Sequence, residues 1–150
     1  MTTIKEDIFK ALETDAIQVM MHVCNNAGVM GAGIALEVKK RYPDAYDAYI
    51  NYGIENHGLY LATISTSSRV INLHAQDGYG RKDGWRYLNY ESLYGSLAAA
   101  REWCEKNSIV SVGVPYGMGA NRAGGDWAVV CAMVESTFAN SGITINIYKL

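Results

Sequence analysis

The chain has 150 residues, of which 49% are hydrophobic and 19% charged, and its formal net charge at pH 7 is −2. This length can bury one sizeable core but leaves little room for a second, so we expect a single domain over residues 1–150. A net charge of −2 provides no overall positive field that would bind a nucleic-acid backbone. Any contact with nucleic acid must therefore be local.

The N-terminus lacks the apolar core of a signal peptide, and no apolar run approaches the length that spans a membrane. We therefore expect a cytoplasmic protein with no membrane partner. Cys24, Cys104 and Cys131 are odd in number and form no C-x-x-C pair, so they indicate neither a disulfide framework nor a zinc site. We expect reduced core thiols, no metal and no cofactor.

Hydrophobic periodicity predicts strands that alternate with helices. The expected elements are an edge strand at 4–7, a buried strand at 15–24, helices at 34–42 and 44–51, a hairpin of strands at 59–65 and 69–73, a helix at 90–107, a strand at 109–114, a helix at 126–140 and a strand at 143–148. Together they predict an α/β fold with three layers, in which helices cover both faces of a mixed central sheet.

Two glycine-rich turns each follow an expected strand and precede an expected helix. The first lies within 22–35 and the second within 115–125. Glycine lets the backbone approach an anion closely, and the N–H groups that start a helix have no intrahelical partners. Ligands of α/β sheets bind at the carboxyl ends of the strands. The two turns therefore predict a site that holds a diphosphate from opposite sides.

The residues of both turns resemble those of macrodomains, the ADP-ribose-binding family with an α/β/α fold, and the resemblance extends over nearly the whole chain. Residues 22–35 match the pattern H-x-x-N-x-x-G-V-M-G-x-G-I-A, and residues 39–49 match K-K-x-Y-P-x-x-Y-x-x-Y. The second turn is similar to P-Y-x-x-G-C-G-L-A-G-G-D-W, except that Ala120, Asn121 and Arg122 replace Cys, Gly and Leu. The branch most resembled includes ADP-ribose-1''-phosphate phosphatases and ADP-ribosyl hydrolases.

The resemblance implies an adenine site formed by Asp7, Ile8 and Tyr148. Asp7 would accept a hydrogen bond from the adenine amino group, but the same residue equally suits the cap of a helix that starts near Ile8. The ring of Tyr148 is placed like an aromatic that packs on adenine, and it equally suits an ordinary strand position.

Three residues are predicted as catalytic, namely Asn25, Asp126 and His22. The amide of Asn25 can both donate to and accept from the distal ribose. The alternative is that Asn25 and Asn26 both shape the turn, and we assign Asn25 to the ligand and Asn26 to the turn. His22 can act as an acid or base, but its apolar run also suits a core histidine. Asp126 can activate a water, and its place at the start of a helix also suits a cap.

The other ligand-binding residues implied by the resemblance lie in the two turns. They are Gly31, Ala32, Gly33 and Ile34 in the first, and Gly117, Met118, Gly119, Ala120 and Asn121 in the second. Arg122 either contacts a phosphate or faces solvent. The loop at 74–87 is long enough to be functional. Related hydrolases carry a catalytic lysine in this region, but Lys82 has no matching local motif.

The resemblance and the two turns lead to a hydrolase that acts at the 1'' position of the distal ribose. The expected substrate is ADP-ribose 1''-phosphate, with loop N–H groups stabilising the negative charge that develops. One alternative is a hydrolase that removes ADP-ribose from modified protein or nucleic acid. Another is a reader or scavenger that binds ADP-ribose or a related nucleotide without turnover.

Overall fold

The structure is a computed structural model that describes all residues from 1 to 150. Six strands form one sheet in the order β1-β6-β5-β2-β4-β3. Their bounds are β1 Thr2–Ile4, β2 Val19–Asn25, β3 Thr63–Thr66, β4 Val70–Gln76, β5 Ser111–Pro115 and β6 Thr144–Tyr148. Only the pairing of β3 with β4 is antiparallel, so the sheet is mixed.

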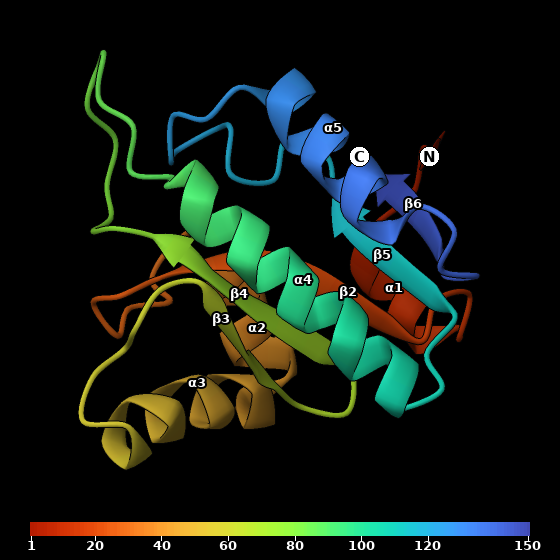
Figure 1. Cartoon of the computed structure of the whole chain (residues 1–150), viewed down its shortest axis with the longest axis horizontal. Helices are drawn as coiled ribbons and strands as arrows, with labels where there is room; N and C mark the ends of the chain where they lie inside the picture. The colour runs from red at the N-terminus through yellow and green to blue at the C-terminus, as the bar shows by residue number, and fades with distance from the viewer.

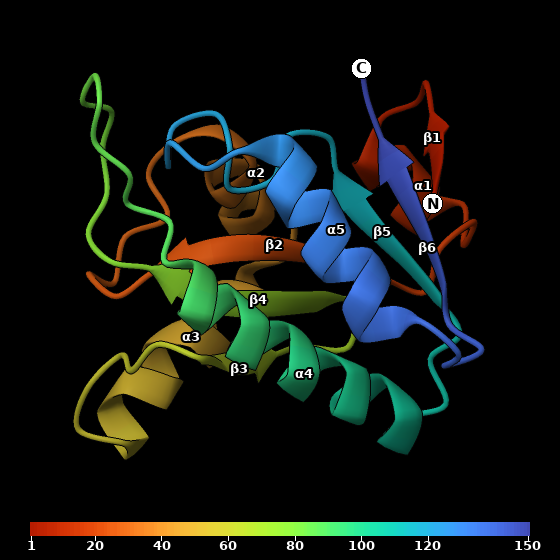
Figure 2. The ribbon, with the colours of Figure 1, turned by 45° about the horizontal axis from the view of Figure 1, so that its top comes forward.

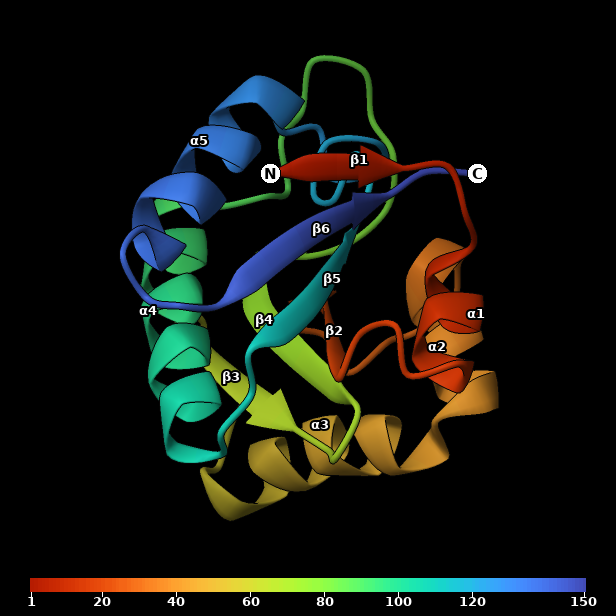
Figure 3. The same ribbon diagram turned by 90° about the vertical axis from the view of Figure 1, so that its right-hand side faces the viewer.

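Five helices cover the two faces of the sheet. They are α1 Ile8–Glu13, α2 Gly33–Arg41, α3 Pro43–Glu55, α4 Tyr90–Lys106 and α5 Trp127–Phe138. Helices α4 and α5 lie on one face, and α1, α2 and α3 lie on the other (Figures 1 and 3). The predicted three-layer α/β fold with a mixed sheet is therefore confirmed. None of these helices has both the length and the hydropathy that a membrane span requires.

Strand β2 lies in the interior of the sheet and is buried on both faces, which explains its almost continuous apolar sequence. Successive side chains point to opposite faces of a strand, so neighbouring residues of β2 enter different cores. Met21 packs in the core beneath α4 and α5 with Leu93 and Leu97. Met20 packs with Leu12 in the core on the opposite face.

Several element boundaries differ from the sequence-based expectation. The strand expected at 15–24 begins at Val19, because Asp15 has a left-handed φ of 58° and residues 14–17 form a hydrogen-bonded turn after α1. The edge strand expected at 4–7 is instead β1 at Thr2–Ile4, since Asp7 caps α1. Helix α3 extends to Glu55, well beyond the expected end at residue 51.

The parallel strands β2, β4 and β5 end at the same edge of the sheet. The loops that follow them gather at this edge, where the long loop after β4 stands beside the turns after β2 and β5 (Figure 2). Parallel pairing thus brings the two glycine-rich turns and the long loop together at one edge of the sheet.

The close approach of α4 to the segment before β3 depends on Gly95. A Cβ atom at this position would lie 2.9 Å from the Cβ of Ala62 and 3.1 Å from its carbonyl oxygen. Replacing an internal helical glycine by alanine ordinarily stabilises a helix by about 1 kcal/mol. Here the backbone contact must open, so we expect Gly95→Ala to lower the free energy of unfolding by roughly 1–3 kcal/mol in urea denaturation.

The control for this measurement is Tyr94→Ala, because the neighbouring Tyr94 side chain is 64% exposed. We expect it to change stability by less than about 0.5 kcal/mol. A Gly95→Ala protein as stable as the parent would contradict the close-packing argument.

Candidate functional site

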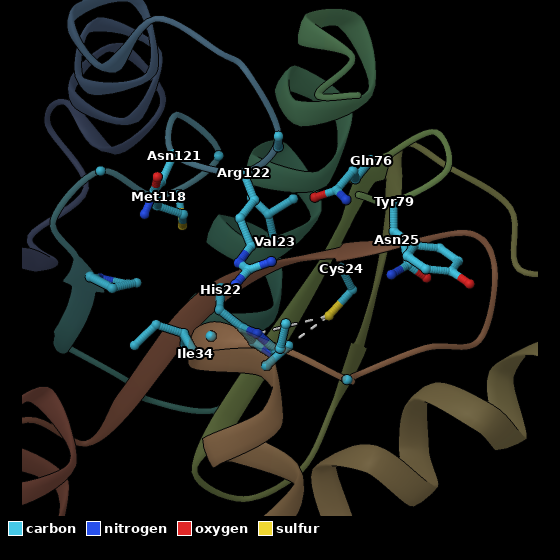
Figure 4. Close-up of a pocket in the computed structure, with 18 of the residues that line it drawn as sticks. His22, Val23, Cys24, Asn25, Ile34, Gln76, Tyr79, Met118, Asn121 and Arg122 are labelled. Atoms are coloured by element: carbon cyan, nitrogen blue, oxygen red, sulfur yellow. Dashed lines mark hydrogen bonds between the residues drawn. The ribbon is translucent and has the colours of Figure 1, made fainter. Parts of the chain in front are cut away.

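A cavity of about 660 Å³ lies between the turns that follow β2 and β5 (Figure 4). Its volume is in the range of small-molecule sites. The strand ends contribute His22, Val23, Cys24, Asn25, Gln76 and Pro115; the first turn and the start of α2 contribute Val29, Gly31, Ala32, Gly33, Ile34 and Ala35; the long loop contributes Tyr79 and Gly80; and the second turn contributes Tyr116, Gly117, Met118, Gly119, Asn121, Arg122 and Ala123.

The first turn is closed by the Asn25 side chain. Its Oδ1 accepts hydrogen bonds from the N–H groups of Ala27 and Val29, at 3.0 and 3.3 Å, and from the Tyr49 hydroxyl at 2.7 Å. Its Nδ2 donates to the Val29 carbonyl oxygen at 2.8 Å. Asn25 therefore shapes the turn while it lines the cavity, with one amide hydrogen left over.

Asn26 does not have the turn-forming role that the sequence analysis assigned to it. Its Nδ2 donates to Asp77 Oδ1, and its Oδ1 accepts from the Gly78 N–H, both at 2.9 Å. These partners lie about fifty residues further along the chain. Asn26 thus ties the first turn to the long loop after β4, a contact that local sequence could not reveal.

The part of the first turn that lines the cavity contains backbone N–H groups without partners. Helix α2 starts at Gly33 and has no side-chain cap, so the N–H groups of Gly33, Ile34 and Ala35 make no hydrogen bond. Gly33 has a left-handed φ of 57°, which favours glycine. The start of a helix combines free donors with a favourable dipole and so suits an anion.

The second turn supplies a similar set from the opposite side. Gly117 and Gly119 have left-handed φ values of 76° and 73°, and their N–H groups are also unpartnered. The turn is braced by the Ala120 N–H, which donates to the Gly117 carbonyl at 2.8 Å. Ala120, which the sequence analysis expected to bind the ligand, does not line the cavity. Its N–H group stabilises the turn, and the neighbouring residues line the cavity.

Two of the three residues that depart from the family pattern, Asn121 and Arg122, give the second turn its polar character. Asn121 Oδ1 accepts a hydrogen bond from Arg81 Nη2 at 2.7 Å, which connects this turn to the long loop. The Arg122 side chain extends from the turn into the cavity (Figure 4). It is the only Arg or Lys in the lining, which contains no Asp or Glu.

A second cavity of about 440 Å³ adjoins the first, since both are lined by Ile34, Pro115 and Tyr116. The predicted residues Asp7, Ile8 and Tyr148 come together here. Asp7 Oδ1 accepts from the Phe9 N–H at 2.9 Å and caps α1, which leaves its other oxygen for a ligand. Tyr148 is only 5% exposed, and its ring packs mainly into the core.

His22 and Cys24 form the buried floor of the larger cavity. His22 Nε2 lies 2.6 Å from Asn72 Oδ1, and Cys24 Sγ lies 3.5 Å from the same nitrogen. Burial lowers the pKa of His22 to about 4, so the ring is neutral at pH 7. Burial raises the pKa of the Cys24 thiol, which therefore stays protonated.

Asp126 lies outside both cavities. Its Oδ1 accepts from the Ala128 N–H at 2.9 Å, so the exposed carboxylate caps α5. Lys82 is also outside, with its ammonium 5.6 Å from the centre of the Trp85 ring. No group of three or more His, Cys, Asp or Glu side chains is arranged to hold a metal ion.

Gln76 and Tyr116 are among the cavity residues that the sequence analysis did not single out as ligand-binding. Gln76 ends β4 beside Asn25, its register partner on β2. Gln76 could have been identified from its position at the end of a strand that runs parallel to β2. Tyr116 follows β5 and lies between the two cavities, 47% exposed.

Comparisons with known proteins agree with this architecture. No family model matches the chain. ADP-ribose glycohydrolase OARD1 of Homo sapiens is 27% identical, over 99% of this chain and 91% of the relative. The macrodomain of Mycobacterium tuberculosis DarG superposes with a TM-score of 0.79 at 22% identity, over 99% of this chain and 97% of that one.

A further neighbour is Thermosipho africanus DarTG, solved in complex with ADP-ribose. Its TM-score is 0.77 at 19% identity, and the match covers 97% of this chain and 40% of that one. The chain therefore has the macrodomain fold, and the resemblance inferred from its two glycine turns is confirmed.

The burial of His22 predicts a pH-dependent stability. Its pKa is lowered from 6.5 to about 4 in the folded protein, so folding favours the neutral ring. The resulting stabilisation is complete above pH 6.5 and is lost as the pH falls from there to about 4. We expect this histidine to account for about 3 kcal/mol of the fall in unfolding free energy across that window.

The measurement compares urea denaturation of the parent and His22→Gln at pH 7, 6, 5 and 4. The pKa of His74 is also lowered by burial, and its effect is common to both proteins. The variant should therefore show a shallower loss of stability with acid. Equal slopes in the two proteins would show that the unfolded and folded states protonate His22 alike.

Proposed function

We propose that this protein binds ADP-ribose across its two adjoining cavities and hydrolyses the bond to a substituent on the 1'' carbon of the distal ribose. The observation that carries the proposal is the pair of opposed glycine turns. Each presents unpartnered backbone N–H groups, at Gly33 and Ile34 on one side and at Gly117 and Gly119 on the other. Such donors suit the oxygens of a diphosphate.

In this proposal adenine occupies the smaller cavity, where the free oxygen of Asp7 accepts from its amino group and Ile8 and Tyr148 supply apolar contact. The diphosphate passes between the turns formed by 31–34 and 117–121. The distal ribose then reaches the floor of the larger cavity, near the remaining amide hydrogen of Asn25.

The relatives support both parts of this proposal. The curated relative is named an ADP-ribose glycohydrolase, and the match extends over almost all of both chains. A structural neighbour with the same fold is solved in complex with ADP-ribose. Any loop N–H group that also reaches the 1'' substituent would stabilise negative charge that develops during hydrolysis.

We further propose ADP-ribose 1''-phosphate as the preferred substrate. The lining of the larger cavity contains the guanidinium of Arg122 and no carboxylate. This charge distribution favours a substituent that carries its own negative charge. ADP-ribose attached to protein or nucleic acid is the alternative substrate for the same cavity.

A second candidate function is binding without turnover. It is favoured by the same lining, because the cavity contains no carboxylate or amine and its one imidazole, that of His22, is almost fully buried. Incubating the protein with ADP-ribose 1''-phosphate, ADP-ribosylated protein and ADP-ribosylated DNA, and identifying the products, separates the candidates. Release of inorganic phosphate supports the first, and binding of ADP-ribose with no product from any substrate supports the second.

Binding is tested by calorimetry with ADP-ribose, for which we expect a micromolar dissociation constant, on the order of −8 kcal/mol. Gly33→Glu should weaken binding at least tenfold (roughly 1.4 kcal/mol), because its side chain adds bulk and like charge beside the phosphates. A Cβ atom at position 33 would meet nothing within 4 Å, so the fold has room for the change.

Gly33→Ala is the matched control, since it introduces the same left-handed strain without the carboxylate. It should bind ADP-ribose far more tightly than Gly33→Glu does. If the two variants bind equally, the phosphates are held elsewhere. If the parent shows no binding at millimolar ADP-ribose, the proposed function fails.

The preference for a phosphate is tested with Arg122→Leu. A charge-assisted hydrogen bond contributes about 1.5–3 kcal/mol, so the variant should lose about 10- to 100-fold in affinity for an ADP-ribose analogue that carries a non-hydrolysable 1''-phosphonate. Its affinity for ADP-ribose itself should stay within about threefold, as should both affinities of the Lys82→Leu control. An equal loss for both ligands would place Arg122 on the diphosphate instead.

A further inference from the structure

The long loop after β4 stands at one end of the larger cavity. In the sheet, β2 lies between β5 and β4, and β6 lies on the other side of β5. The smaller cavity contains Tyr148 from the end of β6, whereas Gln76, Tyr79 and Gly80 line the larger cavity at and after the end of β4. A ligand that fills both cavities therefore crosses the strand ends from β6 towards β4, and its last group lies near the long loop.

One side-chain hydrogen bond joins this loop to the second turn. Arg81 Nη2 donates to Asn121 Oδ1 at 2.7 Å, a contact that we call the Arg81–Asn121 bridge. Asn121 follows β5, and Tyr79, two residues before Arg81, lies on the opposite side of the cavity (Figure 4). Since β2 separates β5 from β4, the bridge crosses the carboxyl end of β2, where Asn25 lines the cavity.

The base and the tip of the loop are held in different ways. Backbone hydrogen bonds fix the base, because the Asp77 N–H donates to the Tyr87 carbonyl at 2.9 Å and the Tyr87 N–H donates to the Ala123 carbonyl at 2.8 Å. In the tip, residues 79–84, the bridge is the only hydrogen bond to a residue outside the loop. The position of the tip across the cavity therefore depends on the bridge.

Two arginines without ion-pair partners meet at this end of the cavity. Arg81 is bonded to Asn121, and Arg122 is the next residue along the chain. Neither guanidinium forms a salt bridge within the protein. Their charge is therefore available to a small anionic group that is bound next to the bridge.

We propose that the Arg81–Asn121 bridge restricts the group on the 1'' carbon to about the size of a phosphate and selects against ADP-ribose that is attached to a protein. This inference rests on the proposed function and names the substrate class of the same site. A phosphate lies within the closed cavity beside the two guanidinium groups. A peptide chain on the same carbon has to pass the loop tip, so the bridge must open first.

The strength of the bridge sets the expected selectivity. An exposed hydrogen bond to a charged side chain corresponds to about fivefold in an equilibrium constant, or roughly 1 kcal/mol. A ligand that binds only when the tip is open loses affinity by the fraction of protein that is open. ADP-ribose and its 1''-phosphate bind with the bridge intact and lose nothing.

The inference is tested by calorimetry with three ligands that the protein cannot hydrolyse. They are ADP-ribose, its 1''-phosphonate analogue, and ADP-ribose joined at the 1'' carbon to a short uncharged peptide by a hydrolysis-resistant bond. The parent should bind the phosphonate at least as tightly as ADP-ribose, and the peptide conjugate at least about fivefold more weakly. Arg81→Ala should bind the conjugate about fivefold more tightly than the parent does, with its affinity for ADP-ribose within about twofold.

Lys82→Ala is the matched control, because it removes one positive charge from the same loop tip and leaves the bridge intact. The Lys82 ammonium lies near the Trp85 ring, and Lys82 lines neither cavity. All three affinities of this variant should stay within about twofold of those of the parent. An equal gain for the conjugate in both variants would assign the selectivity to charge and would overturn the inference.

A measurement without any ligand tests whether the bridge holds the tip. Backbone ¹⁵N order parameters of residues 79–84 should be about 0.85 in the parent and in Lys82→Ala, and should fall below about 0.6 in Arg81→Ala. Unchanged order parameters in Arg81→Ala, or a parent that binds the conjugate as tightly as ADP-ribose, would overturn the inference alone. A parent that binds none of the three ligands would instead overturn the proposed function, and the inference with it.

Discussion

The parallel pairing of β2 with both β4 and β5 is the constraint on which the cavity depends. Because all three strands run in the same direction, their carboxyl ends meet at one edge, and the three following loops must share it. The interior position of β2 also explains why its side chains are so apolar, since helices cover both faces. A polar side chain on this strand must therefore find a partner on a neighbouring strand, as His22 does with Asn72.

Two sets of side-chain hydrogen bonds hold the loops at this edge in place. In the first turn, the Asn25 amide and the Tyr49 hydroxyl replace the backbone partners that the turn lacks, which leaves the N–H groups at the start of α2 free. Between the loops, Asn26 and Asn121 form hydrogen bonds to the segment after β4. Donors held in place in this way lose little entropy when an anion binds, and this pre-organisation favours affinity.

Burial and one cationic side chain set the electrostatics of the larger cavity. Its floor is an imidazole that burial keeps neutral and a thiol that burial keeps protonated, and its only formal charge is that of Arg122. The carboxylate that the sequence offered as a catalyst, Asp126, caps a helix outside the cavity. In the proposed hydrolysis, catalysis would therefore depend on oriented N–H donors and on a neutral histidine.

The sequence by itself determined the features that depend on local chemistry. Apolar periodicity fixed the order and type of most elements, and glycines before a helix indicated the turns, because left-handed backbone and free N–H groups are local properties. Only the tertiary structure decided which side chains meet. Asp126 has the same local signal whether its carboxylate faces a cavity or solvent, and the hydrogen bond between His22 and Asn72 exists only because β2 and β4 pair in this register. Hydrogen bonds between strands join residues far apart in sequence, so no local pattern encodes them.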